Sequence, residues 1–276
     1  MSELKEGKEK ELVVSDNKVQ EKETETLKID PFEHLQKPTA EAEAVAPRMK
    51  RKSFFNPNIL YEYVRYPKSH AESVLFEDEK CVIIKDAYPK AAIHLLLIPK
   101  ETFLVKSSAQ EFIPSDLPKL LQLHETGKQF AKALGLYLDN KGEESAMKIS
   151  DIHSPFLEDL KRRKNLQNFG EFQYGYHIIP SLYPLHLHII TNDFISPFLK
   201  NKKHWNSFTT KYFMEIDVIE NYLHSNQELH KILKIENYEN LLKNPLSCHL
   251  CQSTFPSIPS LKNHLLFHFD KKDDAK

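Results

Sequence analysis

Two histidines separated by a single residue lie in the stretch YPLHLHII at residues 183–190. Leucine and isoleucine alternate with His186 and His188, so a strand would turn its apolar side chains to one face and both imidazoles to the other. Neutral imidazole is a competent nucleophile and proton carrier near pH 7. A histidine pair on a strand is more often structural than catalytic, so it predicts a reactive site only if other polar groups converge on the same face.

Other reactive side chains lie in segments that would neighbour this strand. His94 falls in the stretch HLLLIP, His177 falls in GYHIIPS, and Ser181 lies between His177 and the histidine pair. Several imidazoles and a hydroxyl, with no acidic cluster to bind a metal beside them, are typical of phosphoryl chemistry. One imidazole attacks phosphorus while the others and backbone amides neutralise the oxygens. These residues therefore predict a site for a phosphorylated substrate.

Two cysteines and two histidines near the C-terminal end have the spacing C-x2-C, then twelve residues, then H-x3-H. They are Cys248, Cys251, His264 and His268. Cysteines on a turn and histidines one helical turn apart can converge on one tetrahedral ion. We therefore predict a small C2H2-type zinc finger with a structural Zn²⁺, whose fold depends on the metal.

The first 52 residues are rich in Glu, Lys and Thr and poor in aromatic residues. Such a composition buries too little apolar surface to offset chain entropy, so residues 1–52 are predicted to form a disordered charged tail. The tail ends in APRMKRK, a basic patch that suits a nuclear localisation signal or a solvated linker equally well. We expect a nuclear protein on this basis, with the cytoplasm as a second location.

The remaining chain has the patterns of a globular protein. We expect a short helix before Pro67, strands over 73–89 and 91–100, an amphipathic helix over 116–136, and strands around 172–182 and 185–194. A mixed α and β domain is expected at 53–212, a helical connector at 213–244 and the finger at 245–270. Cys81 lies in an apolar strand and is expected to be a buried thiol. No apolar run approaches the roughly 20 residues of a transmembrane helix, so no membrane partner is expected.

The stretch GYHIIPSLYPLHLHIITNDFISPFLKNKKHWNSF, followed by CQSTFPSIPSLKNHLLFH, resembles the DNA-repair branch of the histidine triad superfamily. The resemblance covers about residues 54–270. It implies an α+β fold, in which an antiparallel sheet with packed helices precedes the C2H2-type zinc finger. It also implies a hydrolase that removes AMP from the 5′-phosphate of abortively adenylated DNA. The implied partner is nicked or 5′-adenylated double-stranded DNA, the implied product is AMP, and we expect a monomer.

The resemblance implies a role for each polar residue of the site. His186 matches the nucleophile that becomes transiently adenylated, and Ser181 matches a serine that assists the leaving group. Three further histidines are implied around the phosphate, namely His94, His177 and His188. Asp86 matches the acid that holds the ribose hydroxyls; the alternative for Asp86 is a turn residue ahead of Tyr88 and Pro89.

The first histidine of the family triad is replaced by Pro184 in this chain. Proline has no side-chain proton to give, and we expect it not to orient a neighbouring imidazole. The lost histidine supports the reaction and is not the nucleophile, so the chemistry is expected to be retained. Two other functions stay open. One is a zinc-finger DNA-binding or scaffold protein with a vestigial site; the other is a general nucleotide hydrolase acting on small AMP conjugates, against which the finger and the KNKKHW segment argue.

For DNA contact, the sequence offers a basic run that ends in an aromatic residue. The run consists of Lys200, Lys202, Lys203, His204 and Trp205. Such a run suits phosphate binding with stacking at a strand end, although a solvated lysine loop is the alternative. The resemblance implies that Phe54 or Phe55 is an apolar wedge against the terminal base pair. The finger is expected to grip the duplex backbone without reading its sequence.

Overall fold

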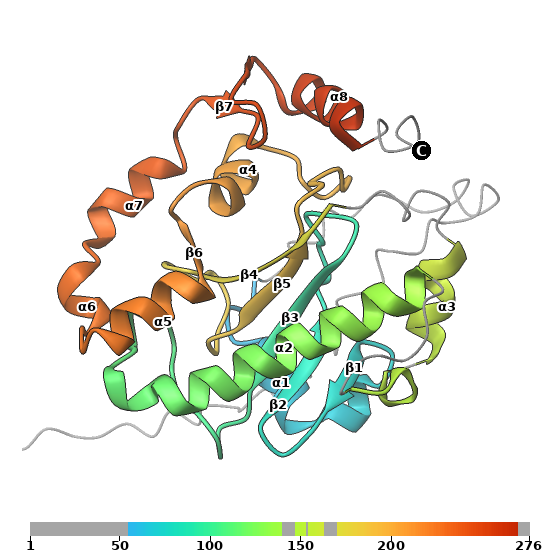
Figure 1. Cartoon of the computed structure of the whole chain (residues 1–276), viewed down its shortest axis with the longest axis vertical. Coiled ribbons are helices and arrows are strands. Elements are labelled where there is room, and N and C mark those ends of the chain that lie inside the picture. Colours follow the sequence, from blue (N-terminus) through green and yellow to red (C-terminus); the bar gives the residue numbers. More distant parts are fainter. Residues whose placement is uncertain (1–54, 140–146, 153, 163–169, 270–276) are drawn as a thin grey trace, which may run out of the picture. The chain divides into compact units, whose positions relative to one another are not determined.

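A six-stranded antiparallel sheet organises the computed structural model (Figure 1), which describes residues 55–139, 147–152, 154–162 and 170–269. The strands lie in the order β1, β2, β3, β5, β4, β6. Their bounds are β1 (Val74–Glu77), β2 (Cys81–Lys85), β3 (His94–Pro99), β4 (Phe172–His177), β5 (Leu187–Thr191) and β6 (Phe213–Glu215). All described residues fall within one compact unit. The expected charged tail and Phe54 lie outside the described residues.

The central strands β2, β3 and β5 are buried along almost their whole length, and most of their side chains are apolar. Strand β3 pairs with β5 so that His94 lies opposite Ile190. Residues opposite each other share a face, as do residues two apart in a strand, so His94 and His188 project from the same face. Leu187 and Ile189 project from the other face into the main core. The alternation expected for this strand is thus confirmed.

Two helices cover the face of the sheet that carries Leu187 and Ile189. Helix α2 (Leu117–Leu138) crosses this face, as Figure 1 shows, and α5 (Ile216–His224) packs against α2. At Gly127 the helix approaches the sheet so closely that a β-carbon would lie 3.3 Å from the side chains of Ile189 and Leu187. The amphipathic helix expected over 116–136 is confirmed to within two residues at its end.

The other helices are shorter. Helix α1 (Leu60–Arg65), the one expected before Pro67, packs against β2 and β3. The remaining helices ahead of the finger are α3 (Ser154–Arg162), α4 (Lys202–Thr209), α6 (Leu229–Ile232) and α7 (Ile235–Leu241). Short 3-10 turns occur at η2 (Pro67–His70), η3 (Ala109–Glu111), η4 (Pro114–Asp116) and η5 (Ile149–Asp151). Within the described ranges, no helix has both the length and the apolar character needed to cross a membrane.

The stretch 213–244 differs from the helical connector that we expected. It begins with β6, which pairs with β4 at the edge of the sheet and places Phe213 opposite His177. Helix α5 then buries Ile216, Ile219 and Leu223 in the main core. A strand of three residues is too short to show a period in the sequence, so the pattern alone does not reveal its pairing. The start of this stretch therefore belongs to the α+β domain and is not a spacer.

The finger consists of a two-stranded sheet, β7 (Leu246–Ser247) with β8 (Thr254–Phe255), followed by α8 (Ile258–Phe269). Its apolar side chains do not form a core of their own. They join one cluster with residues of β5, α4 and β6, and the members include Ile190, Phe194, Trp205, Phe208, Phe213, Leu246, Leu261 and Leu265. The finger therefore packs directly on the α+β domain, and residue 245 does not separate two independent cores.

Candidate active site and metal centre

Four imidazoles meet on the face of the sheet opposite α2. His94 begins β3, His177 ends β4, His188 lies in β5, and His186 comes immediately before β5. The ring centroid of His188 lies 5.2 Å from that of His94, 4.4 Å from that of His177 and 4.8 Å from that of His186. We call these four residues the imidazole cluster. The structure thus brings together all four histidines that the sequence places in the site.

One nitrogen of His186 is fixed by the backbone. Its Nδ1 lies 3.0 Å from the carbonyl oxygen of Pro184, and because a carbonyl only accepts, Nδ1 carries the hydrogen. The Nε2 atom therefore keeps its lone pair, as a nucleophile requires. Our expectation that Pro184 would not orient a neighbouring imidazole is wrong. The proline cannot do so with its side chain, but its carbonyl does.

His94 has no nitrogen left to face a substrate. The amide N–H of Lys90 donates to Nδ1 of His94 at 3.2 Å. Burial, partly offset by Asp86, lowers the pKa of His94 to about 4, so the ring is neutral at pH 7. The hydrogen of His94 is then on Nε2, which donates to Nδ1 of His188 at 2.9 Å. This chain of hydrogen bonds leaves Nε2–H of His188 as a donor, and it has no partner in the described part of the chain.

Burial keeps the imidazole cluster uncharged. It lowers the pKa of His177 to about 3 and holds the pKa values of His186 and His188 below their ordinary range. Nε2 of His177, like Nε2 of His188, is buried without a partner among the described residues. Buried polar atoms are normally paired, so two such nitrogens beside a free lone pair indicate a site that a ligand completes. A phosphate oxygen matches Nε2–H of His188. Nε2 of His177 is left as an acceptor, because the other nitrogen of that ring donates to the backbone of Ser207.

Asp86 lies beside the cluster but is already engaged. Its Oδ1 accepts from the amide of Tyr88 at 2.7 Å, which is the turn role that the sequence left as an alternative. Its Oδ2 lies 3.4 Å from Nδ1 of His94. Burial would raise the pKa of Asp86, but His94 and Lys90 outweigh it and hold the pKa below its usual value. Asp86, His94 and His188 offer atoms within 4.8 Å of one another, so one carboxylate does stand next to the imidazoles.

Lys90 is a cation at the cluster that sequence reasoning missed. Its ammonium donates to the carbonyl of Tyr88, and its charge adds to burial in lowering the pKa of His94. Burial lowers the pKa of Lys90 itself, against the opposing effect of Asp86. The sequence did contain a signal for this role, because Lys90 lies in the turn that leads into the strand that carries His94.

Ser181 is not brought to the imidazoles. It is exposed in the loop between β4 and β5, and no hydrogen bond links it to the cluster within the residues that the structure describes. Its expected role in assisting the leaving group is therefore not supported by a contact in this structure.

The basic run divides into two parts. Lys200, Lys202 and Lys203 are exposed at the start of α4, as a phosphate-binding surface requires. His204 is partly buried, and its Nδ1 accepts from the amide of Lys200 at 3.2 Å. The expectation that Trp205 stacks on DNA is wrong: this side chain is 1% exposed and donates to the carbonyl of Ser247 in the finger at 3.0 Å.

The wedge candidates are only partly described. Phe55 is 70% exposed and lies five residues ahead of α1, so a base pair could reach its ring. Phe54 lies outside the described residues. Exposure of one large apolar side chain is compatible with a wedge, but single exposed apolar residues are common on protein surfaces.

The four predicted zinc ligands converge in the finger. Sγ of Cys251 lies 3.1 Å from Nε2 of His264, Sγ of Cys248 lies 3.6 Å from Nε2 of His268, and the two Nε2 atoms lie 3.0 Å apart. All four ligand atoms fall within 4.8 Å of one another. Tetrahedral Zn²⁺ with bonds of about 2.0–2.3 Å separates its ligands by about 3.3–3.8 Å. The three distances lie inside this range or about 0.3 Å below it at most, so the set fits one zinc ion after a small adjustment of the side chains.

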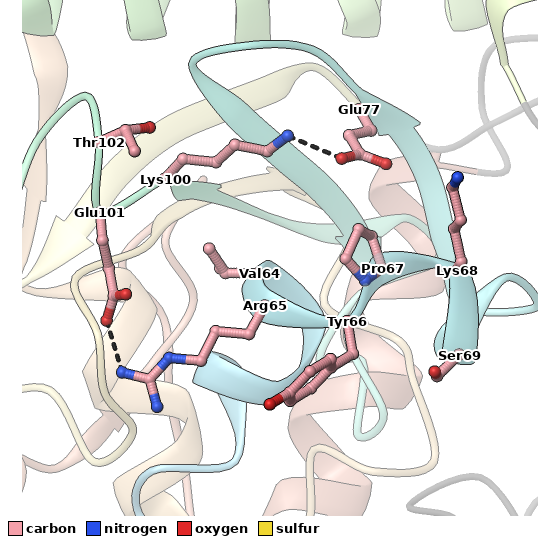
Figure 2. Close-up of a pocket in the computed structure, with 10 residues that line it drawn as sticks. All are labelled: Val64, Arg65, Tyr66, Pro67, Lys68, Ser69, Glu77, Lys100, Glu101 and Thr102. Atoms are coloured by element: carbon pink, nitrogen blue, oxygen red, sulfur yellow. Dashed lines mark hydrogen bonds and ion pairs between the residues drawn. The ribbon is translucent and has the colours of Figure 1, made fainter.

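A surface hollow of about 520 Å³ lies at the end of α1, away from these sites (Figure 2). Two ion pairs of 2.7 Å occupy its charged side chains, Arg65 with Glu101 and Lys100 with Glu77. None of the predicted site residues lines this hollow. Two of its cations, Arg65 and Lys100, are thus paired with carboxylates, and Lys68 is the remaining cation of its lining.

Two protein families match consecutive parts of the chain. Residues 61–204 match the family described as scavenger mRNA decapping enzyme C-term binding. Residues 209–271 match the C2HE / C2H2 / C2HC zinc-binding finger. The first match contains the whole imidazole cluster and the second contains all four predicted zinc ligands.

Curated relatives and solved structures agree with these matches. Aprataxin from Gallus gallus is 36% identical over 197 residues, which make up 71% of this chain and 51% of that protein. An aprataxin-like protein from Saccharomyces cerevisiae is 32% identical over 222 residues, 79% of this chain and 97% of that protein. The crystal structure of the aprataxin ortholog Hnt3 from Schizosaccharomyces pombe has a TM-score of 0.52 at 26% identity, covering 79% of this chain and 94% of that one.

A structure of the aprataxin ortholog Hnt3 in complex with DNA also has a TM-score of 0.52 at 26% identity, with 78% of this chain and 94% of that one covered. The chain spans about half the length of the first curated relatives it matches. The α+β fold that the resemblance implied, an antiparallel sheet with packed helices followed by a finger, is confirmed. The match to the Saccharomyces cerevisiae protein covers almost the whole of that relative, and the two family matches follow one another along this chain. This chain therefore belongs to the aprataxin family of histidine triad proteins.

Proposed function

We propose that this chain removes AMP from the 5′-phosphate of abortively adenylated DNA through a covalent histidine–AMP intermediate. One observation carries the proposal: a free lone pair on Nε2 of His186 stands beside the unpartnered Nε2 atoms of His188 and His177. Membership of the aprataxin family supports it, and so does the DNA bound in a solved structure of the relative Hnt3.

The proposed reaction has two displacements at the AMP phosphorus. First, Nε2 of His186 attacks, the bond from that phosphorus to the bridging oxygen breaks, and the DNA 5′-phosphate leaves with the bonding pair. Nε2–H of His188 donates to a non-bridging oxygen and Lys90 adds positive charge. Water then attacks, the N–P bond breaks, and AMP leaves. The proton released by water passes to a neutral imidazole, for which Nε2 of His177 is the available acceptor.

Two further roles belong to the same proposal. Asp86 would hold the ribose hydroxyls with the carboxylate lone pairs that the Tyr88 turn leaves open. Ser181 would assist the leaving phosphate. Because Ser181 lies on an exposed loop, this role requires bound DNA to reach the loop between β4 and β5.

We propose that DNA phosphates bind Lys200, Lys202 and Lys203, and that Phe55 contacts the terminal base pair. Changing Lys202 and Lys203 together to Ala should weaken binding to every DNA sequence alike. It should also reduce the slope of log K against log salt by about 2, because two phosphate contacts are lost. An unchanged slope would place the DNA on another surface.

Zinc has a structural part in this proposal. Cys248, Cys251, His264 and His268 would hold one Zn²⁺, which supplies the fold of the finger and takes no part in the chemical steps. We also propose that the protein is a nuclear monomer. Imaging of the tagged chain in cells and light scattering of the purified chain test these two points.

The decisive experiment is incubation of the full chain with a nicked duplex that carries a 5′-adenylate. Release of AMP, and a quenched protein-bound AMP that maps to His186, are the expected results. Equal and negligible turnover by the native chain and the His186→Ala variant would indicate a DNA-binding protein with a vestigial site. Turnover of small AMP conjugates without turnover of the adenylated nick would indicate a general nucleotide hydrolase.

A further inference from the structure

One aromatic ring contacts three of the four imidazoles. The centroid of Phe208 lies 4.6 Å from that of His177, 5.3 Å from that of His94 and 5.3 Å from that of His188. The ring stands nearly perpendicular to His94 and to His188, at interplanar angles of 89° and 86°. Edge contacts of this kind restrict how an imidazole can rotate. Phe208 itself is 6% exposed, so it also excludes water from this side of the cluster.

The position of Phe208 matters because the atoms beside it are unpaired. Nε2 of His177 and Nε2 of His188 are buried with no partner in the described part of the chain. A water molecule admitted next to these nitrogens would satisfy them and would compete with a phosphate oxygen. A phenyl ring cannot make such a bond. Phe208 therefore offers neither nitrogen a hydrogen-bond partner, which leaves Nε2 of His188 for the phosphate and Nε2 of His177 for the attacking water.

The helix that carries Phe208 is fastened to the finger by its neighbouring residues. The indole of Trp205 donates to the carbonyl of Ser247 at 3.0 Å. The amide of Asn206 donates to the carbonyl of Leu242 at 3.2 Å and to that of Asn244 at 2.9 Å. Trp205 and Phe208 are three residues apart, hence on one side of α4. The finger and the segment before it thus fix the position of α4 and its rotation about the helix axis, and with them the position of the Phe208 ring against the imidazoles.

We propose that Phe208 is a positioning residue for the reaction proposed above: its ring holds His177 and His188 in the orientations in which their free nitrogens face the substrate, at a place set by the finger through α4. The inference rests on the proposed function only for its use in catalysis. The contacts of Phe208 with the imidazoles exist in the free protein, so they can be tested without substrate.

The first test is an NMR titration of the histidine side chains in the full chain without substrate, followed over the pH range in which zinc stays bound, with midpoints below that range compared by the onset of protonation. In the Phe208→Ala variant, water reaches the cluster and the desolvation that disfavours imidazolium is relieved. We expect the titration midpoints of His177 and His188 to rise by about one pH unit or more, a tenfold gain in proton affinity. Phe130→Leu, a truncation in the main core away from the cluster, is the control and should leave both midpoints in place.

Phe208→Leu guards against loss of the fold. Leucine keeps an apolar cover but lacks the ring edge. The titration midpoints of His177 and His188 in this variant should therefore lie between those of the native chain and those of Phe208→Ala. On adenylated DNA, both variants should lower kcat more than they raise KM, and the acid limb of the pH–rate profile should move upward in step with the midpoints. Zinc content should stay at that of the native chain.

The outcomes separate the two proposals. Unchanged midpoints in folded Phe208 variants would overturn the positioning role, and so would equal shifts in Phe130→Leu. Shifted midpoints in a chain that does not act on adenylated DNA would keep the positioning role and overturn the function. Loss of turnover without any shift would keep the function and overturn the positioning role.

Discussion

The two histidine-rich sites of this chain are assembled in opposite ways. The finger takes its four ligands from residues 248–268, and the ligand atoms all lie within 4.8 Å of one another, close enough to share one ion. The imidazole cluster takes its rings from β3, the end of β4 and the start of β5, and hydrogen bonds and burial hold them in place. A metal can gather ligands from one short segment, whereas rings that come from three strands need a finished sheet and a cover over it.

The same comparison shows that the two sites are not independent. Phe208 covers the imidazoles and belongs to the hydrophobic cluster that contains Leu261 and Leu265 of the finger. Both sites therefore share the packing around α4. The predictions that follow test how far this shared packing couples them.

The largest expected effect is that of removing the nucleophile. His186→Ala should lower release of AMP from adenylated DNA by about 10⁴-fold or more, because no other group can take over the covalent step. Affinity for nicked DNA, measured by fluorescence anisotropy, should stay near the native value. His230→Ala, a change at an exposed histidine of α6, is the control and should leave turnover intact. Native turnover in His186→Ala would remove the cluster from the chemistry.

Loss of zinc should have the next largest effect. Cys251→Ser should abolish zinc binding and unfold α8, since the ion contributes roughly 10–16 kcal/mol in zinc-finger peptides. The sequence places the finger apart from the α+β domain, but the shared packing around α4 leads us to expect a further loss. Hydrolysis of a small AMP conjugate should fall by roughly tenfold, because Phe208 loses its fixed place. Circular dichroism, zinc content and turnover are the measurements. Full activity on the small conjugate without zinc would show that the sites are independent.

The imidazole cluster should make stability depend on pH. The folded pKa of His94 is about 4, against 6.5 in a solvated chain. Between these values the unfolded chain binds a proton that the folded chain does not, so stability rises with pH across this window. The contribution of His94 is complete above pH 6.5, and about 3 kcal/mol is lost as the pH falls to 4. Urea unfolding at pH 7.5 and pH 5 measures the difference.

The variant His94→Gln isolates the contribution of His94 to the pH dependence of stability. It should flatten the pH dependence of stability relative to the native chain, because glutamine does not titrate. Acid also releases zinc from the finger and lowers stability in the same direction. That contribution is common to both chains and cancels in the comparison. An equal slope in the two chains would mean that His94 is protonated alike in the folded and unfolded states.

The smallest expected effect concerns the edge of the sheet. A β-carbon at Gly175 would lie 2.6 Å from the carbonyl oxygen of Met214, so Gly175→Ala should disturb the pairing of β4 with β6. We expect a loss of about 1–3 kcal/mol in the free energy of unfolding and a reduced turnover, since β4 carries His177. Gly135→Ala is the matched control. Its β-carbon meets nothing within 4 Å, so it should stabilise α2 by about 0.5–1 kcal/mol without changing turnover.

Local patterns in the sequence were sufficient for several parts of this protein. The C-x2-C and H-x3-H spacings determined the zinc ligands, because turns and helices have fixed geometry over a few residues. Alternation around residues 185–190 determined which side chains share a face with His188, because the period of a strand is a local property. The burial of Cys81 followed in the same way from its apolar neighbours.

Other features were decided only when distant segments met. Nε2 of His94 in β3 donates to Nδ1 of His188 in β5, so two strands that lie far apart in the sequence together leave the hydrogen of His188 on Nε2. Trp205 reads as a stacking residue in a basic run, yet it is buried against a finger more than forty residues later in the chain. The pattern of residues along the chain shows the period of one helix or strand, but it does not show which other element packs against it. The partners of these residues therefore depend on tertiary contacts.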